Sequence, residues 1–123
     1  MNENRIKLSV NEIEKIKHKY KNVPDDYLDY LKFVGWGSFR QCSFMVSSEP
    51  LKLKNLDIET DIDETDLVFF GDDFDGDFAG FNLKNNGKVI EWWHESDEIH
   101  ETGKTFYEYI REKMGMDKHG NDL

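Results

Sequence analysis

The chain has 123 residues, enough for one domain with a buried core, and its three Trp, five Tyr and nine Phe supply large packing units. Its net charge of −10 argues against nucleic-acid binding, because phosphate contacts need exposed Lys and Arg. No apolar run has the length of a membrane span, the N-terminus lacks the apolar stretch of a secretory signal, and the lone Cys42 excludes an internal disulfide. We therefore expect a cytoplasmic protein that binds neither membrane nor nucleic acid.

Capping and spacing predict a first helix that starts just after Ser9. Ser9 and Glu12 form a capping box, in which the hydroxyl and the carboxylate satisfy free amide groups of the first turn. Apolar residues then recur at helical spacing, so one stripe is expected to face the core. The stripe consists of Val10, Ile13, Ile16 and Tyr20.

A second helix is predicted directly after Val23. Pro24 is expected at the first helical position, where it lacks only an amide that would be unpaired anyway, and Gly35 is suited to the position after the last turn. The predicted apolar face consists of Tyr27, Leu28, Leu31 and Val34.

After Gly37 the pattern changes to short strands. Gln41–Val46 is one predicted strand and Leu51–Leu53 is a weaker one. Asn55–Asp66 is mostly acidic and is expected to be a surface connector. Its possible anchors are Leu56, Ile58 and Ile62.

The next block predicts a buried strand followed by a hairpin. Leu67–Phe70 reads as a short strand ended by Gly71. Asn86-Gly87 favours a type I′ turn, because both residues tolerate positive φ. The arms of the hairpin would be Phe78–Leu83 and Val89–His94.

A final helix is predicted from a second capping box, Thr105 with Glu108. Its inward stripe would consist of Phe106, Tyr109, Ile110 and Met114, and the polar tail from Met116 onward is expected to fray. Helices at both ends with strands between them indicate an α+β domain, with helices covering a mainly antiparallel sheet. One domain over residues 1–123 is expected, with its core at about 9–114.

Several spaced blocks carry a resemblance to a known family. They are Val23-Pro24, Gly35-Trp36-Gly37, Phe70-Gly71-Asp72-Asp73 with Gly76-Asp77, and the run Gly87, Val89, Trp92 and His94. Over roughly residues 9–114 this order resembles the SUKH superfamily, which includes many bacterial toxin-immunity proteins and the domain of a yeast cell-wall assembly regulator. Trp93 departs from the pattern, since such proteins more often carry a polar residue there. The resemblance implies a protein-binding domain.

The negative charge is concentrated in one segment. Between Lys54 and Lys84 there are ten acids and no base, which accounts for a net charge of −10. Acids this dense repel one another unless they are well solvated or meet a cationic partner, so a basic protein partner is favoured. The acids are Asp57, Glu59, Asp61, Asp63, Glu64, Asp66, Asp72, Asp73, Asp75 and Asp77.

Three interpretations of the loop Asp72–Asp77 stay open at this point. Neither register of the loop fits the calcium-binding pattern of an EF-hand, because the sixth and twelfth positions lack the required Gly and Glu together. A tight acidic turn is the simplest interpretation, with Gly76 at positive φ and Asp side chains bonding local amides. A protein contact and a cation site are the alternatives.

No arrangement of residues indicates catalysis or a cofactor. His94 and His100 lie near several glutamates, but the spacing is not that of a zinc site, and His94 is expected to hydrogen-bond its own scaffold. Ser38 and Cys42 lack the local signatures of catalytic nucleophiles, and Cys42 is expected to be a small buried residue. We therefore expect neither an enzyme, nor a bound metal, nor a cofactor.

The adjacent residues Trp92 and Trp93 should face opposite sides of a strand. Trp92 shares its face with Ile90, and Trp93 shares its face with Val89 and Glu91. Either both sheet faces are covered, or Trp93, together with Trp36, is an exposed anchor beside the acids.

The sequence thus predicts an immunity protein that neutralises a cognate toxin domain, of a basic nuclease type, through the ten acids, Trp36 and Trp93. The alternative is a regulatory or scaffold module that binds an endogenous partner.

Overall fold

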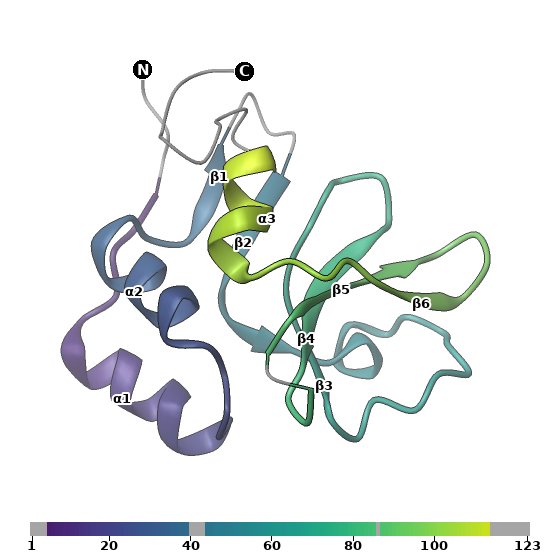
Figure 1. The fold of residues 1–123 in the computed structure, drawn as a ribbon, viewed down its shortest axis with the longest axis horizontal. Coiled ribbons are helices and arrows are strands. Elements are labelled where there is room, and N and C mark those ends of the chain that lie inside the picture. The colour runs from purple at the N-terminus through teal and green to yellow at the C-terminus, as the bar shows by residue number, and fades with distance from the viewer. Residues whose placement is uncertain (1–4, 40–43, 86, 114–123) are drawn as a thin grey trace.

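The computed structural model describes residues 5–39, 44–85 and 87–113. Figure 1 shows the order of the elements. The helices are α1 (Val10–Lys19), α2 (Asp25–Phe33) and α3 (Phe106–Lys113), with one 3-10 turn, η1 (Leu53–Leu56). The strands are β1 (Gly37–Phe39), β2 (Phe44–Leu51), β3 (Leu67–Asp72), β4 (Phe78–Asn82), β5 (Val89–Trp93) and β6 (Glu98–Glu101).

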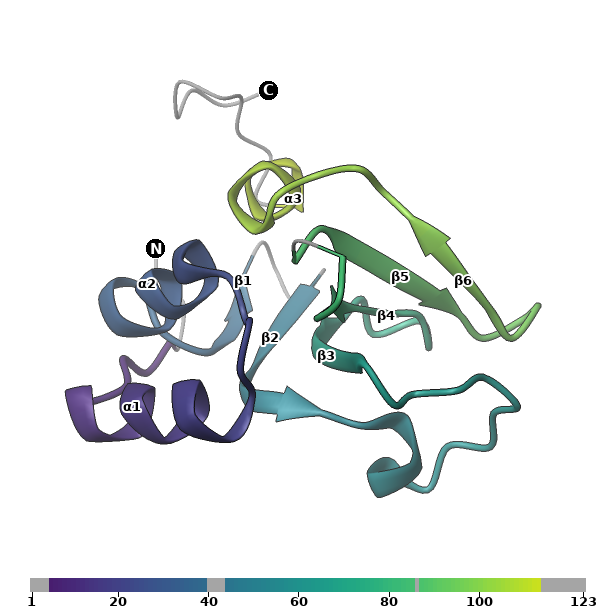
Figure 2. The ribbon, with the colours of Figure 1, turned by 60° about the horizontal axis from the view of Figure 1, so that its bottom comes forward.

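The strands form one antiparallel sheet in which spatial order equals chain order, β1-β2-β3-β4-β5-β6. Each strand pairs with the next along the chain, so no crossover connection is needed. Helices α1, α2 and α3 pack on one face, and the segment from η1 to β3 crosses the other face (Figure 2). The predicted α+β class with an antiparallel sheet and helices at both ends is confirmed.

The helix ends follow the capping chemistry of the sequence. Ser9 N donates to Glu12 Oε1 at 2.9 Å and Glu12 N donates to Ser9 Oγ at 3.2 Å, which confirms the first capping box. Thr105 and Glu108 form the second in the same way. Pro24 differs from the prediction, because it is the extended N-cap of α2 rather than its first helical residue.

Most of the predicted helical stripes are buried. Ile16 of α1 is buried, but Val10, the first residue of the helix, is 59 % exposed. In α2 the buried residues are Tyr27, Leu28, Tyr30 and Leu31. Gly35 has φ +104°, and a side chain there would meet the Ile6 backbone at 2.5 Å, so this turn requires glycine.

The sheet separates two hydrophobic cores, and β3 contributes to both. Val68 and Phe70 face the helices, where Phe70 contacts the rings of Tyr27 and Phe106 at centroid distances of 6.0 and 5.0 Å. Leu67 and Phe69 face the other side, where they pack with Ile90, Trp92 and Leu53. A strand buried on both faces has no polar alternation, which is why this run is continuously apolar.

Several strand predictions need correction. β3 continues through Gly71 to Asp72, because a register shift between Phe69 and Gly71 accommodates the glycine within the strand. The prediction of a weak strand over Leu51–Leu53 is wrong, since Leu51 ends β2 and Leu53 begins η1. The strands β1 and β6 were not predicted from the sequence.

The hairpin of β4 and β5 is confirmed, with Phe81 opposite Val89 and Phe78 opposite Trp92. Each arm is one residue shorter than predicted. Lys88 N donates to Asn85 O at 3.4 Å across the turn, and Gly87 has φ +65°. The residues Asn86, Cys42, Met114 and the tail from Met116 lie outside the described residues, as does the start of the predicted strand Gln41–Val46.

Candidate functional site

The ten acids form two groups rather than one continuous surface. Six lie in the connector between η1 and β3, and four lie in the last residue of β3 and the loop that leads to β4. Asp66 directly precedes β3 and Asp72 ends it, which puts them about 20 Å apart along an extended strand. The connector acids are Asp57, Glu59, Asp61, Asp63, Glu64 and Asp66, and the loop acids are Asp72, Asp73, Asp75 and Asp77.

Glu64 was predicted to contact a partner, but it is only 7 % exposed. Its carboxylate instead accepts hydrogen bonds within the fold. Leu53 N donates to Glu64 Oε1 at 2.6 Å and Lys54 N donates to Glu64 Oε2 at 3.2 Å. The carboxylate therefore caps the first amide groups of η1. Lys52 Nζ also donates to the carbonyl oxygens of Glu64 and Leu67, which ties the ends of the connector together.

The tip of the connector is fastened to the turn between β5 and β6. Asp61 N donates to Asp97 Oδ2 at 2.8 Å, Trp92 Nε1 donates to Asp97 Oδ1 at 2.8 Å, and Thr60 Oγ1 donates to the same oxygen. The backbone bond from Asp61, followed by those from Thr60 and Trp92, lowers the pKa of Asp97. This role of Asp97 was not predicted from the sequence. The two segments lie side by side in Figure 1.

The β3–β4 loop is held by its own acids, as predicted for a tight acidic turn. Asp72 Oδ2 accepts from Phe74 N at 3.1 Å, and Asp73 Oδ1 accepts from Asp75 N and Asp77 N at 2.9 and 3.2 Å. Gly76 has φ +104°, and a side chain there would meet the ring of His94 at 3.0 Å. The loop is therefore pressed against the end of β5.

Asp77 joins this loop to His94. Its Oδ1 accepts from His94 N at 2.9 Å and lies 2.7 Å from His94 Nδ1. The contact with Asp77 raises the pKa of His94. Burial alone would raise the pKa of Asp77, but the bonds from His94 outweigh it and lower that pKa. The expectation that His94 hydrogen-bonds its own scaffold is confirmed.

The two tryptophans have opposite environments. Trp92 is 3 % exposed in the second core, whereas Trp93 is 42 % exposed on the face that carries α3. The Trp93 ring stacks on His100 with a centroid distance of 3.6 Å, and its Nε1 donates to Glu91 Oε1 at 3.1 Å. Tyr109 Oη donates to the other oxygen of Glu91 at 2.6 Å, and burial followed by this bond raises the pKa of Tyr109. Trp93 is thus exposed and fixed.

Two openings adjoin Trp93, with volumes of about 220 and 480 Å³. They share Glu91, Trp93, Tyr109 and Lys113, and the smaller one is also lined by Asp73 and Asp77. Lys113 Nζ lies 5.3 Å from the centre of the Tyr109 ring. We call Asp73, Asp77, Glu91, Trp93, His94, Tyr109 and Lys113 the Trp93 surface, in which Lys113 is a base beside the carboxylates.

Trp36 does not belong to the Trp93 surface. It packs beside the main core, forms an isolated bridge with Ile6, and lines a separate opening beside α1. The connector tip is bonded to Asp97 in the turn that follows Trp93, but no connector acid lines either opening beside Trp93. The structure therefore brings together Trp93, Asp73 and Asp77, but not all the predicted partner-binding residues.

In the described ranges, no group of three or more His, Cys, Asp or Glu side chains is arranged to hold a metal ion. The acidic loop directs its Asp oxygens to its own amides, and His94 is bonded to Asp77. No helix in the described part of the chain is long and apolar enough to cross a membrane. What the geometry offers is a fixed aromatic ring among carboxylates, which suits binding.

Comparison with known proteins agrees with the predicted resemblance. The model of the SMI1 / KNR4 family (SUKH-1) matches residues 7–112. SUKH domains are generally associated with toxin immunity, and the family is not a known enzyme family. Searches of the curated proteins and of the solved structures found no match. Because the family match spans most of the sequence, the chain belongs to the SMI1 / KNR4 (SUKH-1) family.

Proposed function

We propose that the chain is a cytoplasmic, non-catalytic immunity protein that binds and neutralises a cognate toxin domain. The toxin domain is of a basic nuclease type, since carboxylates can replace phosphate charge in its cleft. The observation that carries the proposal is the half-exposed Trp93 beside the carboxylates of Asp73 and Asp77. Membership of the SUKH-1 family supports it.

The Trp93 surface has the properties of a binding hot spot. Hot spots are rich in Trp and Tyr and are surrounded by polar groups that exclude water. The Trp93 ring is already held by His100 on its face and by Glu91 at its nitrogen. A partner that covers it therefore loses little side-chain entropy, which favours affinity.

The remaining exposed acids act at longer range. They are Asp57, Glu59, Asp61, Asp63 and Asp75. Their charge accelerates the approach of a basic partner, and this effect is screened over about 8–10 Å at ordinary ionic strength. Contact at Trp93 sets the dissociation rate, and the acids set the association rate.

A regulatory or scaffold module with an endogenous partner is the second candidate, as the likeness to the yeast regulator suggests. It would use the same Trp93 surface. The two candidates differ in the origin of the partner, so identifying the partner separates them.

The test is co-purification of the tagged chain with the product of the neighbouring gene, followed by binding kinetics. Trp93→Ala should weaken the complex by about 2 kcal/mol or more, as hot-spot residues do. The matched control is Phe33→Ala, which removes an exposed aromatic ring of α2 that lines neither opening beside Trp93. Full affinity in the Trp93 variant, or equal losses in both, would refute the proposed interface.

A further inference from the structure

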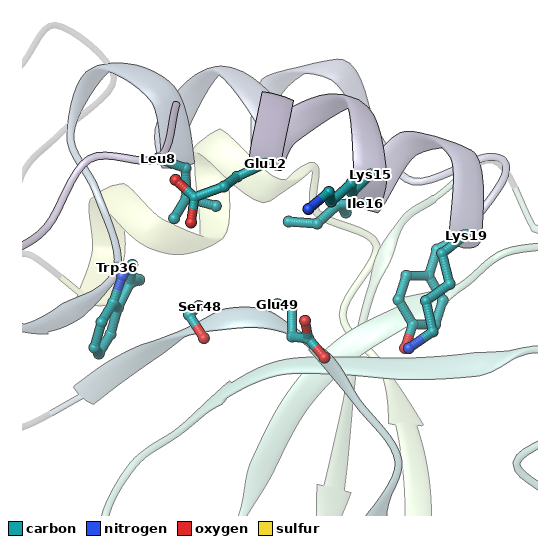
Figure 3. Close-up of a pocket in the computed structure, with 9 residues that line it drawn as sticks. Leu8, Glu12, Lys15, Ile16, Lys19, Trp36, Ser48 and Glu49 are labelled. Atoms are coloured by element: carbon teal, nitrogen blue, oxygen red, sulfur yellow. The ribbon is translucent and has the colours of Figure 1, made fainter. Parts of the chain in front are cut away.

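A third opening lies between α1 and β2, away from the two beside Trp93 (Figure 3). Its volume is about 510 Å³, within the range of about 300–1,000 Å³ that is usual for binding pockets. Figure 3 shows side chains of α1 on one side and Ser48 and Glu49 of β2 on the other, with Trp36 at one end. We call it the α1–β2 groove. It is lined by Leu8, Glu12, Lys15, Ile16, Lys19, Tyr20, Trp36, Ser48 and Glu49.

The strand that borders this groove has an incompletely paired edge. β1 pairs with β2 only from Phe44 to Val46, because the residue before β1, Trp36, pairs with Ile6 instead. Across the described residues, no strand therefore continues along Ser47–Pro50 on the β1 side. On the β3 side the register also shifts between Val46 and Leu51. Ser48 and Glu49, both within this irregular stretch of β2, line the groove.

The helix side of the groove carries two lysines and one acid. Lys15 and Lys19, one turn apart on α1, both line it, and neither has a carboxylate within ion-pair distance in the described part of the chain. Lys19 Nζ lies 5.2 Å from the centre of the Tyr20 ring. Glu12, on the same helix, accepts from Ser9 N at 2.9 Å in the capping box and keeps its negative charge. Two lysines against one glutamate make the helix side of the groove locally basic, and Glu49 lies on the strand side.

The groove also offers apolar contacts. Leu8 and Ile16 are buried residues of its lining, and Trp36 is partly exposed at its end (Figure 3).

We propose that the α1–β2 groove binds an extended acidic segment of a partner protein, which adds as a short strand beside Ser47–Glu49. Main-chain bonds to the strand edge would supply affinity, as in other cases of strand addition. An apolar side chain of the segment packs on Leu8, Ile16 and Trp36, and a carboxylate lies between Lys15 and Lys19. This surface is distinct from the Trp93 surface and has the opposite charge preference.

The test uses two capped hexapeptides as probes, one alternating valine with glutamate and the other alternating valine with lysine. Amide NMR spectra of the whole chain are recorded during titration with each. The glutamate peptide should shift the amides of Ser47–Glu49, the α1 residues and the Trp36 indole. The lysine peptide should bind about tenfold more weakly, since two surface ion pairs together contribute about 1–2 kcal/mol.

Variants then locate the charge recognition. Lys15→Glu/Lys19→Glu should weaken the glutamate peptide by about tenfold, whereas Lys17→Glu/Lys21→Glu makes the same charge change at exposed positions outside the groove and should have a small effect. Glu49→Gln should strengthen binding, because it removes a like charge. The absence of shifts up to millimolar peptide, shifts confined to other surfaces, or equal binding of both peptides would each overturn the proposal. None of these outcomes bears on the Trp93 surface, which the partner-binding experiment tests separately.

Discussion

The connector between η1 and β3 and the loop between β3 and β4 are both acidic, yet they use their acids differently. In the connector, Glu64 is buried as a cap, and the tip is fastened to Asp97, so the segment covers the second core. In the loop, Asp73 and Asp77 order a short turn and leave their charge beside the half-exposed Trp93. Charge density alone therefore does not locate a binding surface; the neighbouring apolar group does.

The largest expected effect on stability distinguishes Trp92, in the core that the connector covers, from Trp93, beside the acidic loop. Trp92→Ala should lower the free energy of unfolding by about 3–5 kcal/mol, because it empties the core that the connector covers and leaves Asp97 without its indole donor. Trp93→Ala should cost much less, since that ring is 42 % exposed. Urea unfolding of both variants is the measurement. Similar large losses would mean that both rings are structural and would remove the contrast between the two regions.

The next effect tests whether the connector acid is structural. Glu64→Ala leaves two amides of η1 without an acceptor in a buried place and should destabilise by about 2–3 kcal/mol. Glu59→Ala, an exposed acid of the same connector, is the matched control and should be nearly neutral. Equal losses in the free energy of unfolding, measured with urea, would show that the hydrogen bonds of Glu64 to η1 do not stabilise the fold.

A smaller effect is expected in the pH dependence of the stability of the β3–β4 loop. The pKa of His94 is raised, so its contact with Asp77 stabilises fully below the usual histidine pKa of about 6.5 and is lost as the pH rises through the folded value. The pKa of Asp77 is lowered, so its contribution is present above about 3.9 and is lost as the pH falls through the folded value.

The pair should therefore hold the loop best between about pH 4 and 6.5. NMR titration of the His94 ring checks this, with Asp77→Asn as the variant that should return the histidine pKa toward its usual value. An unchanged pKa in that variant would mean that Asp77 does not control His94.

The sequence predicted the elements whose signals are local. The capping boxes at Ser9 and Thr105, the apolar run of β3 and the hairpin turn near Gly87 all follow from neighbouring residues. β6 has no such signal, because its polar residues Glu98 and His100 face solvent or the Trp93 ring and it is held by pairing with β5.

The candidate site was only partly predictable for the same reason. Alternation along β5 placed Trp93 opposite Trp92, and composition marked the acids. The burial of Glu64 and the role of Asp97 depend on contacts over 11 and 36 residues of sequence, which no local pattern encodes. Trp36 was grouped with Trp93 by residue type alone, and the topology puts them in different openings.

The smallest expected effect on stability completes the comparison. Replacing Asp72, Asp73, Asp75 and Asp77 by Asn keeps an oxygen that accepts from the loop amides, so the turn should persist, and removing like charges should relieve repulsion. The free energy of unfolding should change by no more than about 0.5–1 kcal/mol. Against the basic partner, however, the variant should associate more slowly, and the dependence of its association rate on salt should flatten.

The matched control replaces four connector acids, Asp57, Asp61, Asp63 and Asp66, by Asn, which makes the same change in net charge. If steering depends only on total charge, both variants slow association equally at low salt. If the loop acids also touch the partner, as the Trp93 surface implies, only the loop variant should also dissociate faster at high salt, where steering is screened. Equal dissociation rates in the two variants would limit the acids to steering and leave Trp93 as the contact that holds the complex.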